Sequence, residues 1–558
     1  MKKLILSLFI MGAVQMVCSQ TQVLDIEYLY QIDGAFYDEV QQVERDSQGN
    51  VYISGMFSGT HDFDFGSGVA ELTSSVRSPF VAKYTAQGAY VWAKIFPSSS
   101  TNGSTSIKID NSGNVYFLGY AQGSVDLNPG GTETLVSMPG LYSFLVKYSA
   151  AGVYITGTTV PLASDITLNG NNVYIVGQFG ETYDFDLGPG DASITAPGSP
   201  SGYVLALDAA ALNYVDVKLI GGTDIHPKQI GFDSNSNMIV SGYYTGDMLI
   251  EQSSGDITIS SNGGSDAFIV YYTLAGDATT AYSIGGAGFD VLHGMHIGAN
   301  NAVYLSGQYE GTVDFNPGSG VNESLSLGGA DGFLLKLNAD KTYAWVYSVG
   351  GAASWNDNIT GIDTDEAGNV FVCGRAVASN VELNPNGVSS TLPGFNLAFI
   401  SKINSNGILV SAYNIGNGNQ SIFPLTIKVI PNSGNLLVGG QVTDGSVFLN
   451  HSGNITINAA DVQDGFFVNY RLQDLVNLHE LTKPAMVLYP NPTKSIIYFE
   501  TEHLGYVQII SNDGKVLLEM NSNNYGAVDM SPFSSGIYFL TLTDINGQVI
   551  QRTKIVKE

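Results

Sequence analysis

One phrase, typified by GNVYISG, recurs through most of the chain and constrains its fold more than any other feature. Consecutive copies are separated by about 64 residues, and self-similarity at a fixed period indicates a repeat architecture. Each repeat must then be one supersecondary element that packs on its neighbours. The seven copies are GNVYISG (49–55), GNVYFLG (113–119), NNVYIVG (171–177), SNMIVSG (236–242), NAVYLSG (301–307), GNVFVCG (368–374) and GNLLVGG (434–440).

Each repeat contains four short strand patterns. The first ends at a turn such as ERDSQGN (44–50), and the second is the recurring phrase. The third is an apolar run such as SFLVKY (143–148), and the fourth follows a second tight turn, as in TAQGAYVWAKIF (85–96). No segment of useful length shows the 3.6-residue apolar period of a helix. Four antiparallel strands repeated in this way predict an all-β fold, a seven-bladed β-propeller.

The two ends of the repeat region complement each other. The seventh repeat ends at DGFFVNYR (464–471) without a fourth strand, whereas LDIEYLYQI (24–32) precedes the first repeat. A Tyr-x-Ile/Val-x-Gly phrase closes this orphan segment, and the same phrase closes the fourth strand of other repeats. We therefore expect residues 24–32 to be the outermost strand of the last blade, so that the N-terminal strand closes the ring.

The composition suits an all-β protein that works outside the cell. Gly (66) and Tyr (31) are abundant, which fits many turns and many strands. The formal net charge of −28 argues against a nucleic-acid partner and against anionic membrane surfaces. Its simplest explanation is the solubility of a secreted protein.

The N-terminal residues read as a targeting segment. Two lysines precede an apolar stretch from Leu4 to about Val17, and Ser19 allows cleavage before Gln20. We interpret residues 1–19 as a secretory signal peptide and expect no transmembrane segment in the mature protein. Cys373 would then be the one remaining cysteine, and its place in an apolar strand predicts an inert buried thiol.

The repeats also resemble a known family. The resemblance is carried by GNVYISG, SDAFIVYYTLAGDATTAYSIGG (265–286) and ADGFLLKLNADKTYAWVYSVGG (330–351). These segments look like the SBBP β-propeller repeat of bacterial surface proteins, over residues from about 24 to 471. The resemblance implies a propeller, but that family has no shared catalytic residues to carry over.

The sequence pattern changes after the repeats. Residues 472–484 read as a linker after a propeller domain at 20–471, and residues 485–558 alternate strand patterns with the turns SNDGKV (511–516) and INGQV (545–549). This pattern predicts a small C-terminal β-sandwich. An ordinary accessory sandwich is one explanation of it.

The tail contains a set of short motifs near its two ends. They comprise Tyr489, Pro490, Asn491, Pro492, Asp513, Gly514, Lys515, Gly536, Tyr538, Lys554 and Lys557. With these residues the tail closely resembles the type A C-terminal sorting domain of the type IX secretion system, in which they are the sorting signal. This resemblance implies export in a Gram-negative cell, by the signal peptide to the periplasm and by the tail across the outer membrane. The implied partners are the type IX translocon and a sorting peptidase that removes the tail, and the implied location is extracellular or on the outer-membrane surface.

Catalytic motifs are absent from the sequence. It contains no sialidase Asp-box, HExxH, P-loop or nucleophile elbow, so no catalytic residue is assigned and we expect a protein that is not an enzyme. His293 and His296 lie three residues apart on a predicted strand. Strand alternation is expected to point them to opposite faces, which disfavours a metal pair there.

The connection between the second and third strands carries a repeated acidic pattern. An apolar residue is followed by Asp, Asn or Glu, and five repeats have a second carboxylate one position before the apolar residue. Turn chemistry explains such residues. A functional alternative is a weak Ca²⁺ site, the only cofactor that the sequence suggests. The candidate ligands are Asp62, Asp64, Asp184, Asp186 and Asp191.

These observations favour a secreted or cell-surface propeller that serves as a non-enzymatic binding or adhesion module. Its ligand would be a glycan or an envelope protein. One alternative is a secreted polysaccharide-degrading enzyme with its site in the central channel, which requires an acid and base clustered there. Another is a structural scaffold for other exported proteins.

Overall fold

The computed structural model divides the chain into two compact units, Met1–Asp474 and Leu475–Glu558. Its described residues form β-strands and no helix, which confirms the all-β fold class. No helix in this described part has the length and apolar character needed to cross a membrane. The expected signal peptide and most of the expected linker lie outside the described residues. The described residues are 22–34, 37–98, 102–252, 255–352, 356–378, 380–383, 390–393, 396–416, 422–449, 454–457, 463–474, 486–501, 505–512, 514–522, 525–544 and 549–558.

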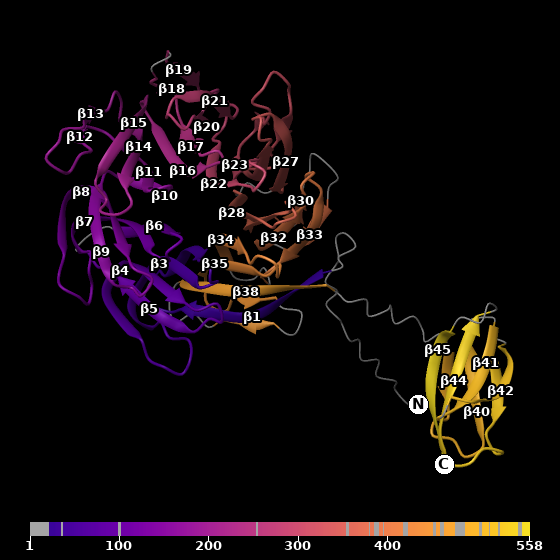
Figure 1. The fold of residues 1–558 in the computed structure, drawn as a ribbon. Coiled ribbons are helices and arrows are strands. Elements are labelled where there is room, and N and C mark those ends of the chain that lie inside the picture. The colour runs from indigo at the N-terminus through magenta and orange to yellow at the C-terminus, as the bar shows by residue number, and fades with distance from the viewer. Residues whose placement is uncertain are drawn as a thin grey trace, which may run out of the picture. The chain divides into compact units, whose positions relative to one another are not determined.

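Seven sheets of the first unit share one order of four antiparallel strands, and Figure 1 shows them arranged around a common centre. Each sheet begins with the strand nearest that centre. The sheets consist of β2 (Glu39–Arg45), β3 (Val51–Asp62), β4 (Glu71–Tyr84) and β5 (Tyr90–Ile95); β6 (Asn102–Ile109), β7 (Val115–Asp126), β8 (Leu135–Tyr148) and β9 (Tyr154–Val160); β10 (Ala163–Asn169), β11 (Asn172–Phe179), β14 (Ser201–Asp208) and β15 (Tyr214–Gly222); β16 (Ile225–Phe232), β17 (Met238–Tyr244), β20 (Asp266–Tyr272) and β21 (Ala278–Ile284); β22 (Val291–Ile297), β23 (Val303–Tyr309), β26 (Asp331–Leu337) and β27 (Tyr343–Gly350); β28 (Asn358–Thr364), β29 (Val370–Ala376), β32 (Leu397–Ile403) and β33 (Leu409–Asn414); and β34 (Ile422–Val429), β35 (Leu436–Val442), β38 (Asp464–Asp474) and β1 (Gln22–Ile32).

The turn before the recurring phrase has a local cause. The Asp46 carboxylate accepts hydrogen bonds from the backbone N–H groups of Gln48 (3.0 Å) and Asn50 (2.9 Å). Gly49 takes a φ of 85°, which an L side chain rarely adopts. An Asx turn therefore joins β2 to β3, and Asp110 and Asp365 make the same bonds in other repeats.

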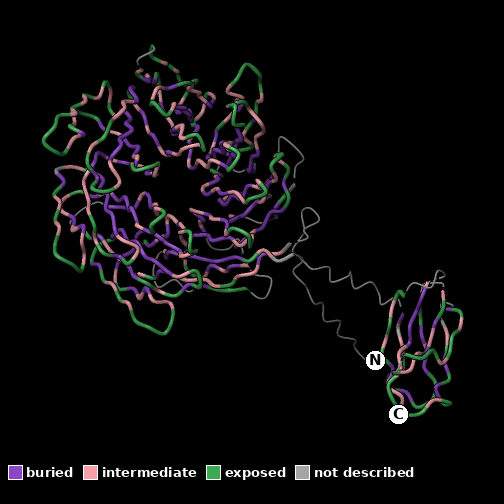
Figure 2. The backbone as a smooth tube through the Cα atoms, in the orientation of Figure 1, coloured by how far each residue is buried: buried purple, intermediate pink, exposed green. Residues whose placement is uncertain are grey.

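The core lies between neighbouring sheets rather than inside one of them. Figure 2 shows buried residues along the middle strands and exposed residues on the outer hairpins. One cluster contains Val43 and Phe80 of the first sheet together with Leu437 and Phe467 of the last. Each inner strand also contacts the next one around the centre, and β34 contacts β2. The first and last sheets are therefore packed together.

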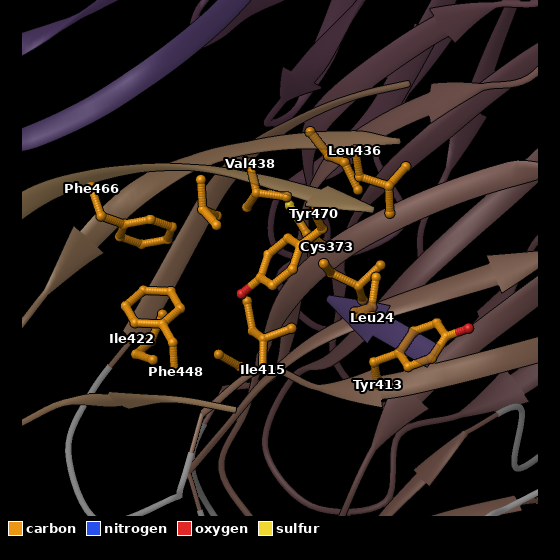
Figure 3. Packing of buried hydrophobic residues seen from close by; sticks show 14 of the residues in the cluster. Leu24, Cys373, Tyr413, Ile415, Ile422, Leu436, Val438, Phe448, Phe466 and Tyr470 are labelled. Carbon is orange, nitrogen blue, oxygen red and sulfur yellow. The ribbon is translucent and has the colours of Figure 1, made fainter. Parts of the chain in front are cut away.

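β1 is the outer strand of the sheet that holds β34, β35 and β38. Its antiparallel register with β38 pairs Ile32 with Gly465 and Tyr30 with Phe467. Figure 3 shows Leu24 of β1 in a buried cluster with Tyr470 and with Cys373 of the neighbouring sheet. The orphan segment of the sequence thus supplies the fourth strand of this sheet.

Hairpins between the second and third strands form ladders with the neighbouring sheet in two places, and isolated bridges join Val313 to Gly286 and Phe448 to Gly416. The β18–β19 hairpin pairs with β15, and the β30–β31 hairpin pairs with β27. Separate short sheets are formed by the hairpins β12–β13, β24–β25 and β36–β37. These hairpin strands are β12 (Thr182–Asp184), β13 (Ser193–Thr195), β18 (Asp247–Ile250), β19 (Ile257–Ser260), β24 (Thr312–Asp314), β25 (Glu323–Leu325), β30 (Asn380–Leu383), β31 (Ser390–Pro393), β36 (Val447–Phe448) and β37 (Ile455–Thr456).

The second unit is built from two sheets. One has the order β39-β40-β43 and the other β42-β41-β44-β45. Phe499 of the first sheet and Ile509 and Leu540 of the second share one buried cluster, so the unit is a small sandwich. Its strands are β39 (Met486–Tyr489), β40 (Ile496–Thr501), β41 (Gly505–Ser511), β42 (Val516–Ser522), β43 (Tyr525–Asp529), β44 (Gly536–Asp544) and β45 (Val549–Lys557).

Candidate functional site

Every inner strand of the propeller carries a β-bulge at the same point. In β22, Leu292 pairs with Gly307 and Gly294 pairs with Ser306, so His293 is the extra residue. A bulge leaves one residue out of the pairing and re-aims its side chain. We call the seven extra residues the bulge ring. They are Gln41, Thr105, Ser164, Lys228, His293, Thr360 and Leu425.

All members of the bulge ring line one cavity at the centre of the propeller. The cavity has a volume of about 750 Å³, and its other lining residues come mainly from the same inner strands. Small-ligand sites commonly measure about 300–1,000 Å³. The ring thus presents seven side chains of six types, with Thr occurring twice, to a space of ligand size. We call this space the central channel.

Both His293 and His296 line the central channel. Their neighbours belong to different sheets, which agrees with the expected alternation. The charge of Lys228 on β16 acts on His293, whereas His296 contacts β28. His296 Nε2 lies 2.9 Å from Thr364 Oγ1, and His296 Nδ1 lies 3.3 Å from an oxygen of Asp363.

His293 has a less satisfied position than His296. Its Nε2 atom is buried without a hydrogen-bond partner among the described residues. Burial lowers the pKa of His293, while a hydrogen bond with Gln308 raises it and the Lys228 charge lowers it further. Burial thus disfavours the charged imidazole, whereas an anion beside Nε2 would favour it, so that Nε2–H could donate a hydrogen bond to that anion.

One carboxylate of the channel lies between two lysines. Glu44 lies 3.0 Å from the Lys108 ammonium and 3.4 Å from that of Lys428. Burial alone would raise the pKa of Glu44, but the two lysines outweigh it and hold that pKa below its ordinary value. Glu44 chiefly raises the pKa of Lys428 in return. These three residues come from the adjacent strands β2, β6 and β34, so the network ties sheets together.

Lys228 lacks such a partner. The described residues form no ion pair with its ammonium group, which lies 5.3 Å from the centre of the Tyr243 ring. Burial lowers the pKa of Lys228, and no opposing charge is near enough to offset that effect. Lys228 and His293 belong to neighbouring inner strands, so the ring has a cationic side without a counter-charge.

The first predicted calcium hairpin uses its carboxylates internally. Asp62 accepts hydrogen bonds from the backbone N–H groups of Asp64 (3.0 Å) and Ala70 (2.7 Å). Asp64 accepts one from the N–H of Gly66 at 2.9 Å. The hydrogen bond from Ala70 N–H lowers the pKa of Asp62 most, and the bond from Asp64 N–H lowers it further. Phe63, between the two carboxylates, is buried and anchors the hairpin.

The second predicted calcium hairpin has the same design. Asp184 accepts hydrogen bonds from the N–H groups of Asp186 (3.0 Å) and Ala192 (2.8 Å). Asp186 in turn accepts one from the amide two residues further along the chain. Asp191 accepts a separate bond from Ser193 N–H at 3.0 Å. The structure therefore places Asp191 outside the network that joins Asp184 to Asp186.

Another hairpin makes these bonds with an asparagine. Asp314 accepts from the N–H groups of Asn316 (2.9 Å) and Asn322 (2.8 Å), and Asn316 Oδ1 accepts from Gly318 N–H at 2.9 Å. Turn formation alone therefore accounts for the repeated Asp and Asn residues of these hairpins, because an amide oxygen accepts the same backbone hydrogen bond as a carboxylate oxygen. Within the described ranges, no group of three or more His, Cys, Asp or Glu side chains is placed to hold a metal ion. Calcium binding at Asp62, Asp64, Asp184, Asp186 and Asp191 stays a prediction.

In the second unit, the structure brings two sorting motifs together. The Asn491 amide donates a hydrogen bond of 2.6 Å to the Lys554 carbonyl, and its Oδ1 accepts one of 2.9 Å from Val556 N–H. Tyr489 stacks on Tyr498 with ring centres 5.9 Å apart. The Tyr-Pro-Asn-Pro segment is thus fastened to the last strand, although 63 residues separate Asn491 from Lys554.

The remaining sorting residues lie along β44, β45 and their turns. Gly536 pairs with Lys557 across the β44–β45 ladder. The Tyr538 hydroxyl donates a 2.8 Å hydrogen bond to the Ser534 carbonyl. Gly514, with a φ of 87°, forms the turn that ends at Lys515. Pro490 and Pro492 flank Asn491, and Asp513 lies outside the described residues.

Sequence reasoning did not find the bulge ring. Its residues share no chemical type, so no motif marks them. The available signal was one alignment position at which otherwise similar strands carry residues of different charge and size. Aligning QQVE (41–44), KQIG (228–231) and HGMH (293–296) would have shown that column.

Comparison with known proteins assigns the tail. Residues 487–558 match the family described as the secretion system C-terminal sorting domain. This match indicates export by the type IX secretion system to a cell-surface or secreted location.

The longer similarity to a curated protein is distant. An uncharacterized WD repeat-containing protein of Acanthamoeba polyphaga mimivirus is 25% identical over 418 residues. The match covers 60% of this chain and 30% of that protein, so this chain spans less than a third of its relative.

Solved structures give weak matches. Quinohemoprotein alcohol dehydrogenase from Comamonas testosteroni has a TM-score of 0.37 and 12% identity over 81% of this chain and 78% of that chain. The Dos1 propeller has a TM-score of 0.33 and 7% identity over 80% of this chain and 95% of that chain. Similarity this low says nothing about activity.

Proposed function

We propose that this chain is an exported, non-enzymatic binding protein whose ligand occupies the central channel. The supporting observation is the bulge ring, in which seven repeated strands line one cavity with side chains of six types. A repeated scaffold buries similar residues at similar places to keep its fold. Residues that differ at one half-buried position of the inner strands are free to recognise a ligand.

The contacts inside the channel favour binding over catalysis. Glu44 is held between two lysines, and each nitrogen of His296 lies beside a neighbouring side chain of the protein. A general acid or base must instead reach the proton that it transfers. The alternative of a polysaccharide-degrading enzyme would use this same channel. As a binding module, the protein would recognise a glycan or an envelope component.

The details of export are part of this proposal. The second unit would engage the type IX translocon and then be removed by the sorting peptidase, which leaves the propeller on the outer membrane or in the medium. The repeats would belong to the SBBP type that their sequence resembles. Mass spectrometry of the exported protein would give its mature ends and test both cleavages.

A glycan array tests the channel as the binding site. The full chain is compared with Ser164→Trp, which fills the channel from the bulge ring, and with Thr182→Trp on an exposed hairpin. We expect Ser164→Trp to lose the captured glycans and Thr182→Trp to keep them, while both retain the wild-type melting temperature. Glycan capture that survives Ser164→Trp would move the site elsewhere. Turnover of a bound polysaccharide would favour the enzyme.

A further inference from the structure

The central channel differs in charge from the rest of the chain. The protein has 50 acidic and 22 basic residues. The bulge ring nevertheless contains Lys228 and His293 and no carboxylate. Glu39 and Glu44 line the same cavity, but Arg77 holds Glu39, and Lys108 and Lys428 hold Glu44. Lys108 also lies near Asp165 and Lys428 near Asp363, so Lys228 is the lining lysine whose charge no described carboxylate offsets.

A buried cation without a partner is unfavourable, and the protein avoids this elsewhere. Lys83 and Lys336 each lie over an aromatic ring and also donate a hydrogen bond to a carbonyl of the next sheet, at 2.9 Å and 2.8 Å. Lys228 has the ring but no described acceptor. An anion in the channel would accept a hydrogen bond from the Lys228 ammonium, for which the described residues provide no acceptor.

His293 adds a second group at the same place. Its strand β22 contacts β16, which carries Lys228. Its Nε2 atom is buried and has no hydrogen-bond partner within the described part of the chain. An anion beside the Lys228 ammonium is thus within reach of a second polar group that is already desolvated.

The other members of the ring indicate what the rest of the ligand looks like. Thr105 and Thr360 donate their hydroxyl protons to backbone carbonyls, which leaves their oxygens to accept from ligand hydroxyls. Gln41 donates to Glu39 and keeps a buried Oε1 without a partner among the described residues, and Ser164 adds a further hydroxyl. A cavity of about 750 Å³ has room for a monosaccharide or a disaccharide. Leu425 provides one apolar contact, as the carbon face of a sugar requires.

We propose that the central channel binds a sugar acid, with the carboxylate of the ligand at Lys228 and His293 and its hydroxyls along the remaining bulge ring. This inference rests on the proposed function of the channel and names its ligand class. It also explains why the two basic residues of the ring lie on adjacent strands.

Calorimetry with matched sugars tests the proposal on the full chain. The probes are D-galacturonate, D-glucuronate, the methyl ester of D-galacturonate and D-galactose. We expect the acids to bind and the ester and galactose to bind at least about tenfold more weakly, which corresponds to about 1.4 kcal/mol. The ester is the critical probe, since it removes the negative charge and keeps the ring and its hydroxyls.

Variants locate the carboxylate. Lys228→Gln and His293→Gln should each weaken galacturonate binding, and the lysine change should leave the ester unaffected. Lys228→Arg should retain acid binding because it keeps the charge. Lys341→Gln is the matched control, since Lys341 also lies over a tyrosine ring, at 4.9 Å, but outside the channel. Melting curves followed by tryptophan fluorescence show that each variant is folded.

The outcomes separate this inference from the proposed function. If the ester and galactose bind as tightly as the acids, and Ser164→Trp abolishes that binding, the channel is the site and the sugar-acid inference is wrong. If the acids bind equally well to Lys228→Gln and Ser164→Trp, both proposals fail. Absence of acid binding at millimolar concentration would overturn the inference, while the glycan array would still decide the function.

Discussion

Gly350 lies directly against the buried carboxylate of Asp331, so that a Cβ on Gly350 would stand 2.1 Å from Asp331 Cγ. The same contact recurs one repeat earlier, where a Cβ on Gly285 would stand 2.4 Å from Asp266 Cγ. In these repeats, the glycine of the phrase that ends the fourth strand makes room for an aspartate that begins the third. This relationship explains why Tyr-Ser-Ile/Val-Gly recurs.

Replacing Gly350 with alanine should therefore destabilise the propeller. Overpacking of this kind typically costs about 1–3 kcal/mol. Urea unfolding followed by the fluorescence of the tryptophans measures it, since all three tryptophans (92, 345 and 355) belong to the first unit. In the double variant Asp331→Ala/Gly350→Ala, the added methyl group has space. The loss of unfolding free energy in the double variant should therefore be smaller than the sum of the losses in the two single variants. Strict additivity would show that the two residues do not interact.

The stability of the propeller should fall as the pH rises through 6 to 7. Burial, followed by the charge of Asp357, raises the pKa of Asp331 to about 7, and burial raises that of Asp357 to about 6. The same effect raises the pKa of Asp38 to about 7 and that of Asp290 to about 6. A raised native pKa means that the folded state holds protons that the unfolded state releases. The stabilisation is thus present at pH values below the unfolded pKa of about 4 and is lost as the pH passes the folded pKa.

Unfolding free energies at pH 5.5, 7.0 and 8.5 check this expectation. Asp331→Asn should flatten the slope and make the protein more stable than wild type at pH 8.5, by about 1–2 kcal/mol, since one pKa unit corresponds to about 1.4 kcal/mol. The exposed carboxylate of Asp340 provides the control, because Asp340→Asn should leave the slope unchanged. A wild-type stability that does not vary between pH 5.5 and 8.5 would contradict the raised pKa values.

Removal of the N-terminal strand should prevent stable ring closure. A chain without residues 21–33 loses the ladder that pairs β1 with β38 and uncovers the buried Phe467. We expect loss of the cooperative melting transition of the propeller. Truncation after Asp474, which removes the other compact unit, is the control and should leave that transition in place. A strand deletion that melts at the wild-type temperature would show that closure does not need β1.

Residues 485–558 should be sufficient for export across the outer membrane. They contain the sorting-domain match and form a sandwich with a core of its own. A fluorescent protein placed between the signal peptide and this tail should reach the surface or medium when the type IX system is intact. Asn491→Ala, which removes both hydrogen bonds to the last strand, should reduce export. Equal export from a strain that lacks the system would refute the assignment.

Calcium should stabilise the hairpins slightly if they bind it. Extracellular calcium modules bind at roughly 10⁻⁴–10⁻³ M. A site of this strength adds only about 1 kcal/mol in millimolar calcium. The melting temperature should rise a little with Ca²⁺ and less with Mg²⁺, and the rise should shrink when Asp62, Asp64, Asp184 and Asp186 become asparagine. Melting curves that coincide in calcium and in chelator would leave turn formation as the only role of these residues.

The sequence by itself determined the elements of this protein. Its period of about 64 residues, its strand alternation and its Asp-x-x-Gly turns predict four strands in each repeat, because these are local properties of the chain. The role of the orphan segment at 24–32 as a fourth strand could be predicted for the same reason, since its Tyr-x-Ile/Val-x-Gly phrase matches the end of the fourth strand in other repeats. The tail was identified from short motifs near its two ends.

Only the tertiary structure decided which residues meet. A bulge is a property of the pairing between two strands, so no local pattern marks His293 as the unpaired residue that lines the channel. The bulge ring consists of one residue from each of seven strands, and successive members lie some 60 residues apart along the chain. No local sequence pattern therefore shows that these residues line one cavity. Buried pairs such as Asp331 and Gly350 likewise form because neighbouring strands bring them together.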